Sequence, residues 1–389
     1  MCPEALVEKI DNISKIYRSE HYPGLCIRSA YPADDARLIE LFAETIPCDY
    51  FDIQLKREPS YLAVSHLQYN RSETKVIVPE KYPEEVIGML NIGWKYCYIN
   101  EKPDLIRYIS DLKITPKYRN RNLIAFLMQY LQEIMPQDGM VQSIVLNNHA
   151  VLQNILYQPK SYLPRAYAYD DVDVYTLSQM SKPKAFANFH FKLLTKSQIP
   201  AVNEFVESLK TDFNFLPHYD FKHLVDQVNP YWRGMQLSDF YVVYNQVKQI
   251  VGIYGLWDQS GFKQIQLKNY AASYHYLRPF YNIFASFSQR MALPTENEDL
   301  NYLMLHSALC KPAYTELYAS MLYHALRHTR MRKKDACCVA LASNDARRLA
   351  FKGTHYFKLS AQHRLHSFYQ NPLNYLDRNK ISYFELGRL

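Results

Sequence analysis

Three cationic side chains, Lys117, Arg119 and Arg121, stand between a predicted strand and a predicted helix. The strand covers residues 108–114, and the helix that follows has apolar residues at every third or fourth position, namely Leu123, Phe126, Leu127, Tyr130, Leu131 and Ile134. A helix N-terminus presents free N–H groups and the positive end of the helix dipole, so it attracts phosphate. We therefore expect an anionic cofactor at residues 119–123. The alternative is a solvated basic turn.

The composition is that of a globular protein with about two domains. The 389 residues are 48% hydrophobic and 21% charged, which allows more than one core and argues against disorder. A net charge of +7 permits an anionic ligand without requiring nucleic acid. The seven cysteines form no C-x-x-C pair, so we expect neither a zinc site nor a disulfide framework.

The sequence predicts a soluble, cytoplasmic protein without membrane contact. Residues 1–20 are charged and lack the apolar core of a signal peptide. No apolar run is long enough to span a bilayer. Neither G-x-x-x-x-G-K-[ST] nor G-x-S-x-G occurs, so nucleotide hydrolysis and serine-esterase chemistry have no support.

A comparison of the two halves of the chain indicates a duplication. Residues 27–42 align with residues 191–206 at an offset of 164, and both segments read as a short strand followed by a helix. At the same offset Ile87-Gly88-Met89 aligns with Val251-Gly252-Ile253. Further along, residues 143–157 align with residues 337–351 at an offset of 194.

The change in offset places an insertion in the second copy, between Trp257 and Leu300. We therefore predict two domains, residues 1–180 and residues 181–389, the second with an insertion near residues 257–300. The boundary lies in the polar segment of residues 178–188, which contains Pro183.

Each half reads as strand, helix, antiparallel strands, strand, helix, strand, helix and strand, and the first half has a P-x-x-R turn from Pro116 to Arg119. This order resembles the GNAT superfamily of acyl-CoA-dependent N-acyltransferases. The resemblance implies an α/β fold with a mixed α+β sheet, built from tandem GNAT-like domains. The second copy is degenerate, because residues 302–325 contain neither an arginine-rich turn nor a glycine.

The signature of this family, R/Q-x-x-G-x-G/A, falls on six consecutive residues here: Arg119, Asn120, Arg121, Asn122, Leu123 and Ile124. Arg119 matches, Asn122 replaces the first glycine, and Ile124 replaces the second small residue. Asparagine tolerates positive φ better than other non-glycine residues, whereas a β-branched side chain near phosphates needs room. The resemblance implies that this turn binds acetyl-CoA or another acyl-CoA, and it implies no metal.

The resemblance also implies catalytic roles near the turn. A backbone N–H of the strand that contains Leu112 and Ile114 would polarise the thioester carbonyl, and Tyr157 would protonate the departing sulfur. The second-half counterpart of Tyr157, Phe351, has no proton to give. Asp111 is the candidate base, since a buried carboxylate can acquire a raised pKa. The alternatives are a Tyr157 that only packs, an Asp111 that only binds backbone, and a water chain as the base.

We therefore expect an acyltransferase of class EC 2.3.1, specifically an N-acetyltransferase that moves an acyl group from acyl-CoA to a primary amine of a small molecule or peptide. One alternative is an inactive GNAT-like module that binds a protein or peptide. Another is a tRNA-dependent aminoacyl transferase that uses the basic and aromatic insertion. Nucleic acid is not the expected partner, and the insertion is predicted to form a lid or an interdomain contact.

His324 and His328 have metal-ligand spacing, but H-E-x-x-H is absent, which favours an ordinary helix face.

Overall fold

The computed structural model describes residues 16–43, 45–47, 51–137, 139–147, 162–227, 229–288 and 290–389. The described elements of the first half are β1 (Leu25–Ser29), α1 (Asp35–Phe42), β2 (Thr45–Pro47), β3 (Phe51–Lys56), α2 (Tyr61–Gln68), β4 (Arg71–Pro79), β5 (Gly88–Ile99), β6 (Lys102–Ile114), α3 (Leu123–Ile134), β7 (Val141–Leu146) and β8 (Arg165–Gln179). Those of the second half are β9 (His190–Leu193), α5 (Ile199–Ser208), β10 (Phe213–Asn214), β11 (Leu216–Pro217), α6 (His223–Asp226), β12 (Phe240–Tyr244), β13 (Ile250–Trp257), β14 (Gln264–Tyr270), α7 (Ala272–Ser288), β15 (Tyr302–Cys310), α8 (Thr315–Met331), β16 (Ala336–Ala342), β17 (His355–Ser367) and β18 (Ile381–Ser382).

The same elements recur in both halves, which confirms the predicted duplication and the mixed α/β fold. α1 begins at Asp35 and α5 begins at Ile199, so the offset of 164 holds. β14 and α7 lie between β13 and β15 and have no equivalent between β5 and β6 among the described residues, whereas the predicted bounds of the insertion stay a prediction.

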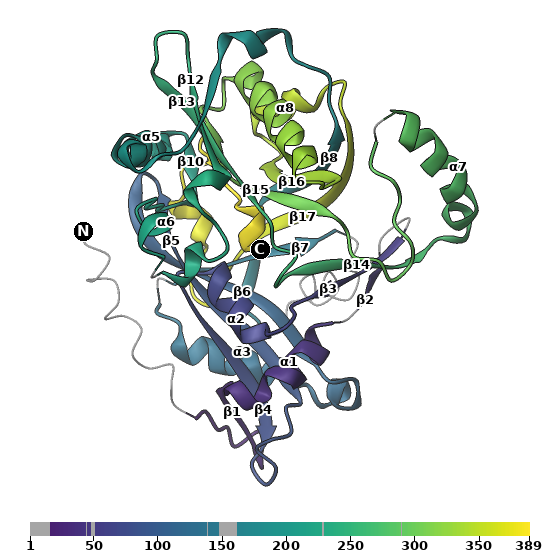
Figure 1. Cartoon of the computed structure of the whole chain (residues 1–389). Coiled ribbons are helices and arrows are strands. Elements are labelled where there is room, and N and C mark those ends of the chain that lie inside the picture. The colour runs from purple at the N-terminus through teal and green to yellow at the C-terminus, as the bar shows by residue number, and fades with distance from the viewer. Residues whose placement is uncertain are drawn as a thin grey trace.

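The two halves share one large sheet (Figure 1). Its strand order is β1-β4-β5-β6-β7-β17-β8-β16-β15-β13-β12-β9, with β11 beside β5. The last long strand of each half is exchanged, because β17 pairs with β7 and β8 pairs with β16, and both also pair with each other. The predicted boundary at residues 180 and 181 falls between β8 and β9, and its role as a domain boundary stays a prediction.

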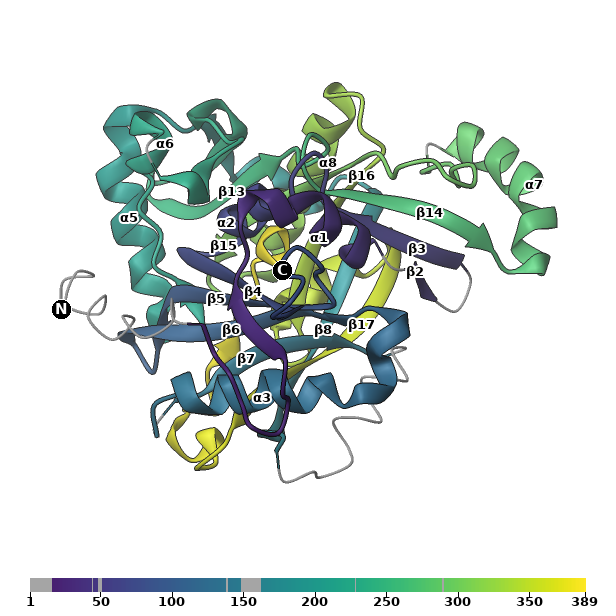
Figure 2. The same cartoon turned by 90° about the horizontal axis from the view of Figure 1, so that it is seen from below.

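Helices cover both faces of the sheet in the first half (Figure 2). The apolar side of α3 packs on one face, where Phe126 and Leu127 are fully buried with Ile92 and Trp94. On the opposite face, Leu38 of α1 and Tyr61 of α2 pack with Met89 of β5, among other residues. Side chains alternate along a strand, so Lys95 points away from the face that α3 covers. That face of β5 looks toward the second half.

The insertion contacts the first half. β14 pairs antiparallel with β3, from Gln264 opposite Lys56 to Tyr270 opposite Phe51. The expectation of an interdomain contact is therefore confirmed. α7 follows β14 and extends away from the body of the molecule in both views (Figures 1 and 2).

Candidate functional site

β6 and β7 are parallel neighbours that stay paired for only two residues. Arg107 is opposite Val141 and Tyr108 is opposite Gln142, after which β6 continues to Ile114 and β7 continues to Leu146. Along its whole length β7 remains paired with β17. β6 therefore leaves the ladder, and residues 109–114 and 143–146 form a fork that opens toward α3. We call this the β6–β7 fork.

A β-bulge lies within the fork. Asn91 is opposite Ser110 and Met89 is opposite Lys113, so Asp111 and Leu112 together face the single residue Leu90. Asp111 has a φ of 57°, which is unusual for a residue other than glycine. A bulge re-aims the backbone groups of its strand, and bulges are frequent beside active sites. The candidate backbone donors Leu112 and Ile114 belong to this bulged end of β6.

The basic turn lies at the open end of the β6–β7 fork, directly after β6. Residues Pro116–Arg121 form a 3₁₀ turn, Asn122 adopts φ 55° and ψ 29°, and α3 begins at Leu123. The prediction that asparagine makes the positive-φ turn in place of glycine is therefore confirmed. The Asn122 side chain does not cap the helix. Instead, Asn122 Oδ1 accepts from the Tyr162 hydroxyl and the Asn122 main-chain oxygen accepts from the Tyr22 hydroxyl, each at 3.1 Å.

The side chains of the turn are largely exposed, including Lys117, Arg119, Asn120 and Arg121. Arg119 Nε donates to the Ile114 carbonyl at 3.2 Å, which ties the turn to the end of β6. The Arg121 guanidinium lies 5.1 Å from the ring of Tyr118. Ile124, whose bulk was a concern for phosphate binding, is half-buried and packs against the core beneath α3. Its side chain therefore belongs with the core rather than with the exposed turn.

Asp111 is held in an ion pair at the bulge. Its Oδ2 accepts from Arg57 Nη1 at 2.6 Å and from the Tyr61 hydroxyl at 2.7 Å. The Arg57 side chain is only 3% exposed and lies 4.2 Å from the ring of Phe42. Burial and the Asp111 charge raise the pKa of Tyr61 well above its usual range, so Tyr61 remains a donor. The geometry gives Asp111 a structural role at the bulge, and its role as a base stays a prediction.

Tyr157 lies outside the described residues. Its comparison with Phe351 rested on the offset of 194, and the parallel strand pairs correct that value. Ser110 corresponds to His306 at the start of the bulge in each half, which sets an offset of 196. The parallel pairs Arg107–Val141 and Leu303–Cys337 extend this offset to β7 and β16. The comparison of Tyr157 with Phe351 therefore stays a prediction and carries no argument about which half is active.

The second half contains the same bulge, but there it is occupied. His306 is opposite Gly255 and Leu309 is opposite Ile253, so Ser307 and Ala308 face one residue, and Ser307 has a φ of 49°. The Ser307 N–H donates to Glu385 Oε2 at 2.7 Å. Sequence reasoning missed Glu385, because the alignment gave its segment no counterpart in the first half.

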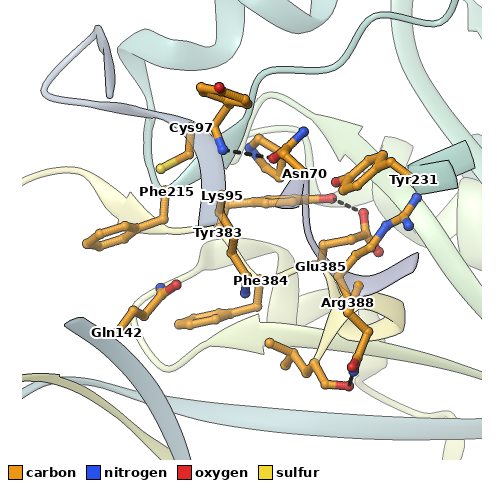
Figure 3. A pocket seen from close by; sticks show the side chains of 14 residues that line it. Asn70, Lys95, Cys97, Gln142, Phe215, Tyr231, Tyr383, Phe384, Glu385 and Arg388 are labelled. Carbon is orange, nitrogen blue, oxygen red and sulfur yellow. Dashed lines mark hydrogen bonds between the residues drawn. The ribbon is translucent and has the colours of Figure 1, made fainter. Parts of the chain in front are cut away.

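A small cavity adjoins the closed end of the β6–β7 fork (Figure 3). It leaves about 30 Å³ for the centres of water molecules, enough for about two of them. Its lining combines strand residues of the first half with residues of the second half: Gln68, Asn70, Lys95, Tyr96, Cys97, Gln142, Phe215, Pro217, Tyr231, Tyr383, Phe384, Glu385, Arg388 and Leu389. Gln68 Oε1 and Arg388 Nε are buried there and have no hydrogen-bond partner among the described residues, as expected beside a hydrated space.

Lys95 is the most unusual group in this cavity. Its Nζ lies 3.7 Å from the ring of Tyr108, the last residue of β6 that pairs with β7. Burial lowers the pKa of Lys95 to about 7, against the opposing effect of Glu385. Burial likewise lowers the pKa of Lys263 to about 7, and its Nζ donates to the main-chain oxygen of Leu389. The sequence gives no sign that either lysine is buried, because their burial results from contacts between the two halves.

The two histidines of α8 are structural. Nδ1 of His324 hydrogen-bonds the Tyr254 hydroxyl, and Nδ1 of His328 hydrogen-bonds the Tyr241 hydroxyl at 2.8 Å. Burial lowers the pKa of His324 to about 3. Among the residues that the structure describes, no group of three or more His, Cys, Asp and Glu side chains is arranged to hold a metal. Within the same residues, no helix is long and apolar enough to cross a bilayer.

Comparisons with known proteins agree with this geometry. The model of the acetyltransferase (GNAT) family matches residues 38–154. No curated protein sequence matches the chain. Among solved structures, Saccharomyces cerevisiae N-myristoyltransferase with bound myristoyl-CoA is similar at a TM-score of 0.58 and 10% identity, over 97% of this chain and 92% of that chain. A GCN5-related N-acetyltransferase from Sphaerobacter thermophilus reaches a TM-score of 0.50 at 12% identity, over 89% of this chain and 96% of that chain.

The family match covers the fork, the bulge and the basic turn, and the shared fold extends over nearly the whole chain. Residues 38–154 are therefore similar to the acetyltransferase (GNAT) family, and the whole chain has a tandem GNAT-like fold.

Proposed function

We propose that the protein is an acyl-CoA-dependent N-acyltransferase whose first half binds the acyl-CoA. The observation that carries the proposal is the β6–β7 fork, which brings a backbone bulge and the N-terminus of α3 to one place. The pyrophosphate of coenzyme A would bind the backbone N–H groups of residues 119–124, with Arg119 and Arg121 nearby. The thioester would lie at the bulge, near the N–H groups of Leu112 and Ile114.

The reaction joins the acceptor nitrogen to the thioester carbon and breaks the C–S bond. The nitrogen loses one proton and the departing thiolate gains one. Backbone N–H groups at the bulge would stabilise the negative oxygen of the tetrahedral intermediate. In this proposal Tyr157 supplies the proton to sulfur, and Asp111 or cavity water receives the proton from the amine.

The second half offers support for the oxyanion role. There the N–H of the bulge residue Ser307 binds a carboxylate oxygen, so a bulge of this geometry accommodates a negatively charged oxygen. The N–H is fixed by the strand and needs no rearrangement to donate, which is the condition for electrostatic stabilisation of a transition state. Asp111 occupies the corresponding position in the first half.

The acceptor would approach on the face of β5 and β6 that carries Lys95, because α3 covers the other face. The cavity beside Lys95 and Gln142 would form the inner end of the acceptor site. We propose a primary amine of a small molecule or peptide as the acceptor. Acetyl-CoA is the simplest acyl donor. The similarity to an enzyme with bound myristoyl-CoA makes a longer acyl-CoA the alternative donor.

Isothermal titration with acetyl-CoA, myristoyl-CoA and free coenzyme A tests the cofactor site. We expect binding of one molecule per chain, and weakening of roughly tenfold or more in the variant Arg119→Ala/Arg121→Ala, since phosphate contacts with guanidinium groups are charge-assisted. Lys182→Ala/Lys184→Ala is the matched control, because it removes two exposed cations outside the fork. Equal binding by all three proteins would exclude the turn as the site.

A second candidate function is a binding module without catalysis. The ion pair between Arg57 and Asp111 favours it, because it leaves the carboxylate engaged at the bulge. A panel of primary amines separates the two candidates. Tight acyl-CoA binding without release of free thiol for any amine would support the module and contradict the enzyme.

A further inference from the structure

The bulge of the second half is filled by a side chain of the same chain. Ser307 follows Asp111 by 196 residues, the offset of the paired strands, and both residues have positive φ within a two-against-one bulge. In the first half the bulge faces the β6–β7 fork. In the second half the corresponding bulge faces Glu385. The carboxylate therefore binds the backbone N–H that corresponds to the N–H of Asp111 in the first-half bulge.

One oxygen of the Glu385 carboxylate accepts hydrogen bonds from three donors. Its Oε2 accepts from the Tyr219 hydroxyl at 2.6 Å, the Ser307 N–H at 2.7 Å and the Tyr383 hydroxyl at 3.1 Å. Glu385 is 6% exposed and Ser307 is fully buried. Figure 3 shows the Tyr383 hydroxyl directed at the carboxylate. A buried carboxylate is stable only when such partners compensate its charge, so the site is built for a carboxylate.

Glu385 belongs to residues 383–389, which connect the two halves. The Tyr383 N–H donates to the Asn214 carbonyl at 2.9 Å, and Gln259 Nε2 donates to the Gly387 carbonyl at 2.9 Å, both within the second half. At its far end the segment reaches α2, because Gln68 Nε2 donates to the main-chain oxygen of Leu389 at 2.7 Å. The Arg388 guanidinium also donates to the main-chain oxygen of Leu67.

This segment forms one wall of the cavity beside Lys95. Tyr383, Phe384, Glu385, Arg388 and Leu389 all line it. The opposite wall belongs to β5 and β7 of the first half, through Lys95 and Gln142. The position of the wall thus depends on where Glu385 is anchored.

We propose that Glu385 is a positioning residue: its carboxylate fills the second-half bulge and thereby anchors residues 383–389 as the wall of the acceptor site in the first half. The anchoring depends only on the contacts above. The link to the acceptor rests on the proposed acyltransferase function.

Removal of the carboxylate followed by chemical rescue tests the anchoring. Glu385→Ala leaves three buried donors unpaired, so we expect a lower Tm and amide exchange in residues 383–389 that is faster by roughly tenfold or more. Acetate has the size of the atoms removed. An excess of sodium acetate should restore both values in the variant and leave the wild type unchanged, whereas sodium chloride at equal ionic strength should not.

Two further variants keep the test decisive if Glu385→Ala does not fold. Glu385→Gln retains the shape and loses the charge, and Tyr383→Phe removes a single donor. Both should accelerate exchange in residues 383–389 without a change in α3. Glu204→Ala, an exposed glutamate of α5, is the control and should change nothing. Unchanged exchange in all Glu385 and Tyr383 variants, or a variant insensitive to acetate, would overturn the anchoring.

The kinetics of the Glu385→Gln variant test whether Glu385 positions the wall of the acceptor site. We expect a higher KM for the amine with an unchanged Kd for acyl-CoA, because the fork lies in the other half. A fall in acyl-CoA affinity instead would contradict the assignment. Acetate rescue without any acyl-CoA binding would leave the anchoring in place and reject the proposed acyltransferase, so the two failures are distinguishable.

Discussion

At the scale of single residues, the bulge in β6 depends on one buried ion pair. Asp111 has positive φ and its carboxylate is bound by Arg57 and Tyr61, so the strained backbone and the ion pair occur at the same residue. Backbone strain persists only where its surroundings fix it. The ion pair thus stabilises the bulged backbone of the fork, and this role is independent of any role of Asp111 as a base.

The first prediction concerns this pair. Asp111→Asn leaves the Arg57 guanidinium buried without its counter-charge, so we expect a loss of about 3 kcal/mol in the free energy of unfolding, measured with urea. Combining it with Arg57→Met should recover part of that loss. Asp104→Asn, an exposed aspartate on the same strand, is the control. A loss no larger than that of the control would contradict a structural role for the pair.

Lys95 gives the second prediction, which concerns pH. Burial lowers its pKa to about 7 in the folded protein, while the unfolded value is that of an ordinary lysine. Between these values the unfolded chain binds more protons than the folded one, so stability rises with pH. The free energy of unfolding of the wild type should therefore increase relative to Lys95→Met from pH 7 to pH 9. Lys81→Met, at an exposed site, should show no such trend. A pH-independent difference for Lys95→Met would exclude the low pKa.

At the scale of elements, the turn before α3 was partly predictable. The sequence indicated a strand, a basic turn and an amphipathic helix from residue 108 onward, and the structure contains them. The tolerance of asparagine for positive φ is a local property, so the conformation of Asn122 followed from its residue type. The bulge could not be predicted from residue type, because it depends on the register between two strands rather than on Asp111 itself.

The third prediction tests the turn. Asn122 has a φ of 55°, a region that costs an ordinary side chain about 1–2 kcal/mol. We expect Asn122→Gly to be more stable than Asn122→Ala by about 1 kcal/mol in chemical denaturation. Both variants lose the bond from the Tyr162 hydroxyl, so the comparison isolates the backbone. Equal stability would show that the turn relaxes to negative φ.

At the scale of the whole molecule, the duplication was visible in the sequence but the exchange of strands was not. Helix starts and apolar runs are local, so the offset of 164 could be read from the chain. The pairing of β17 with β7 and of β8 with β16 joins residues 160 or more positions apart, and no local pattern encodes it. The cavity and Glu385 depend on the same distant contacts, which is why sequence reasoning missed them.

The fourth prediction follows from the exchange. Fragments of residues 1–180 and 181–389 each lack a strand that pairs with the centre of their own sheet, so neither should give a stable monomer alone. Mixed or co-expressed, they should associate and regain the circular dichroism spectrum of the full chain. The full chain should unfold in one cooperative transition. A first fragment that folds alone and binds acyl-CoA would contradict the shared sheet and favour independent domains.

The central claim is that coenzyme A binds in the β6–β7 fork of the first half. A crystal structure of the full chain grown with coenzyme A tests it most directly. The account predicts electron density for the pyrophosphate against residues 119–124, with the pantetheine arm along β6 toward Asp111 and none at Ser307. Density at the second-half bulge with an empty fork, or no bound coenzyme A at a saturating concentration, would contradict it.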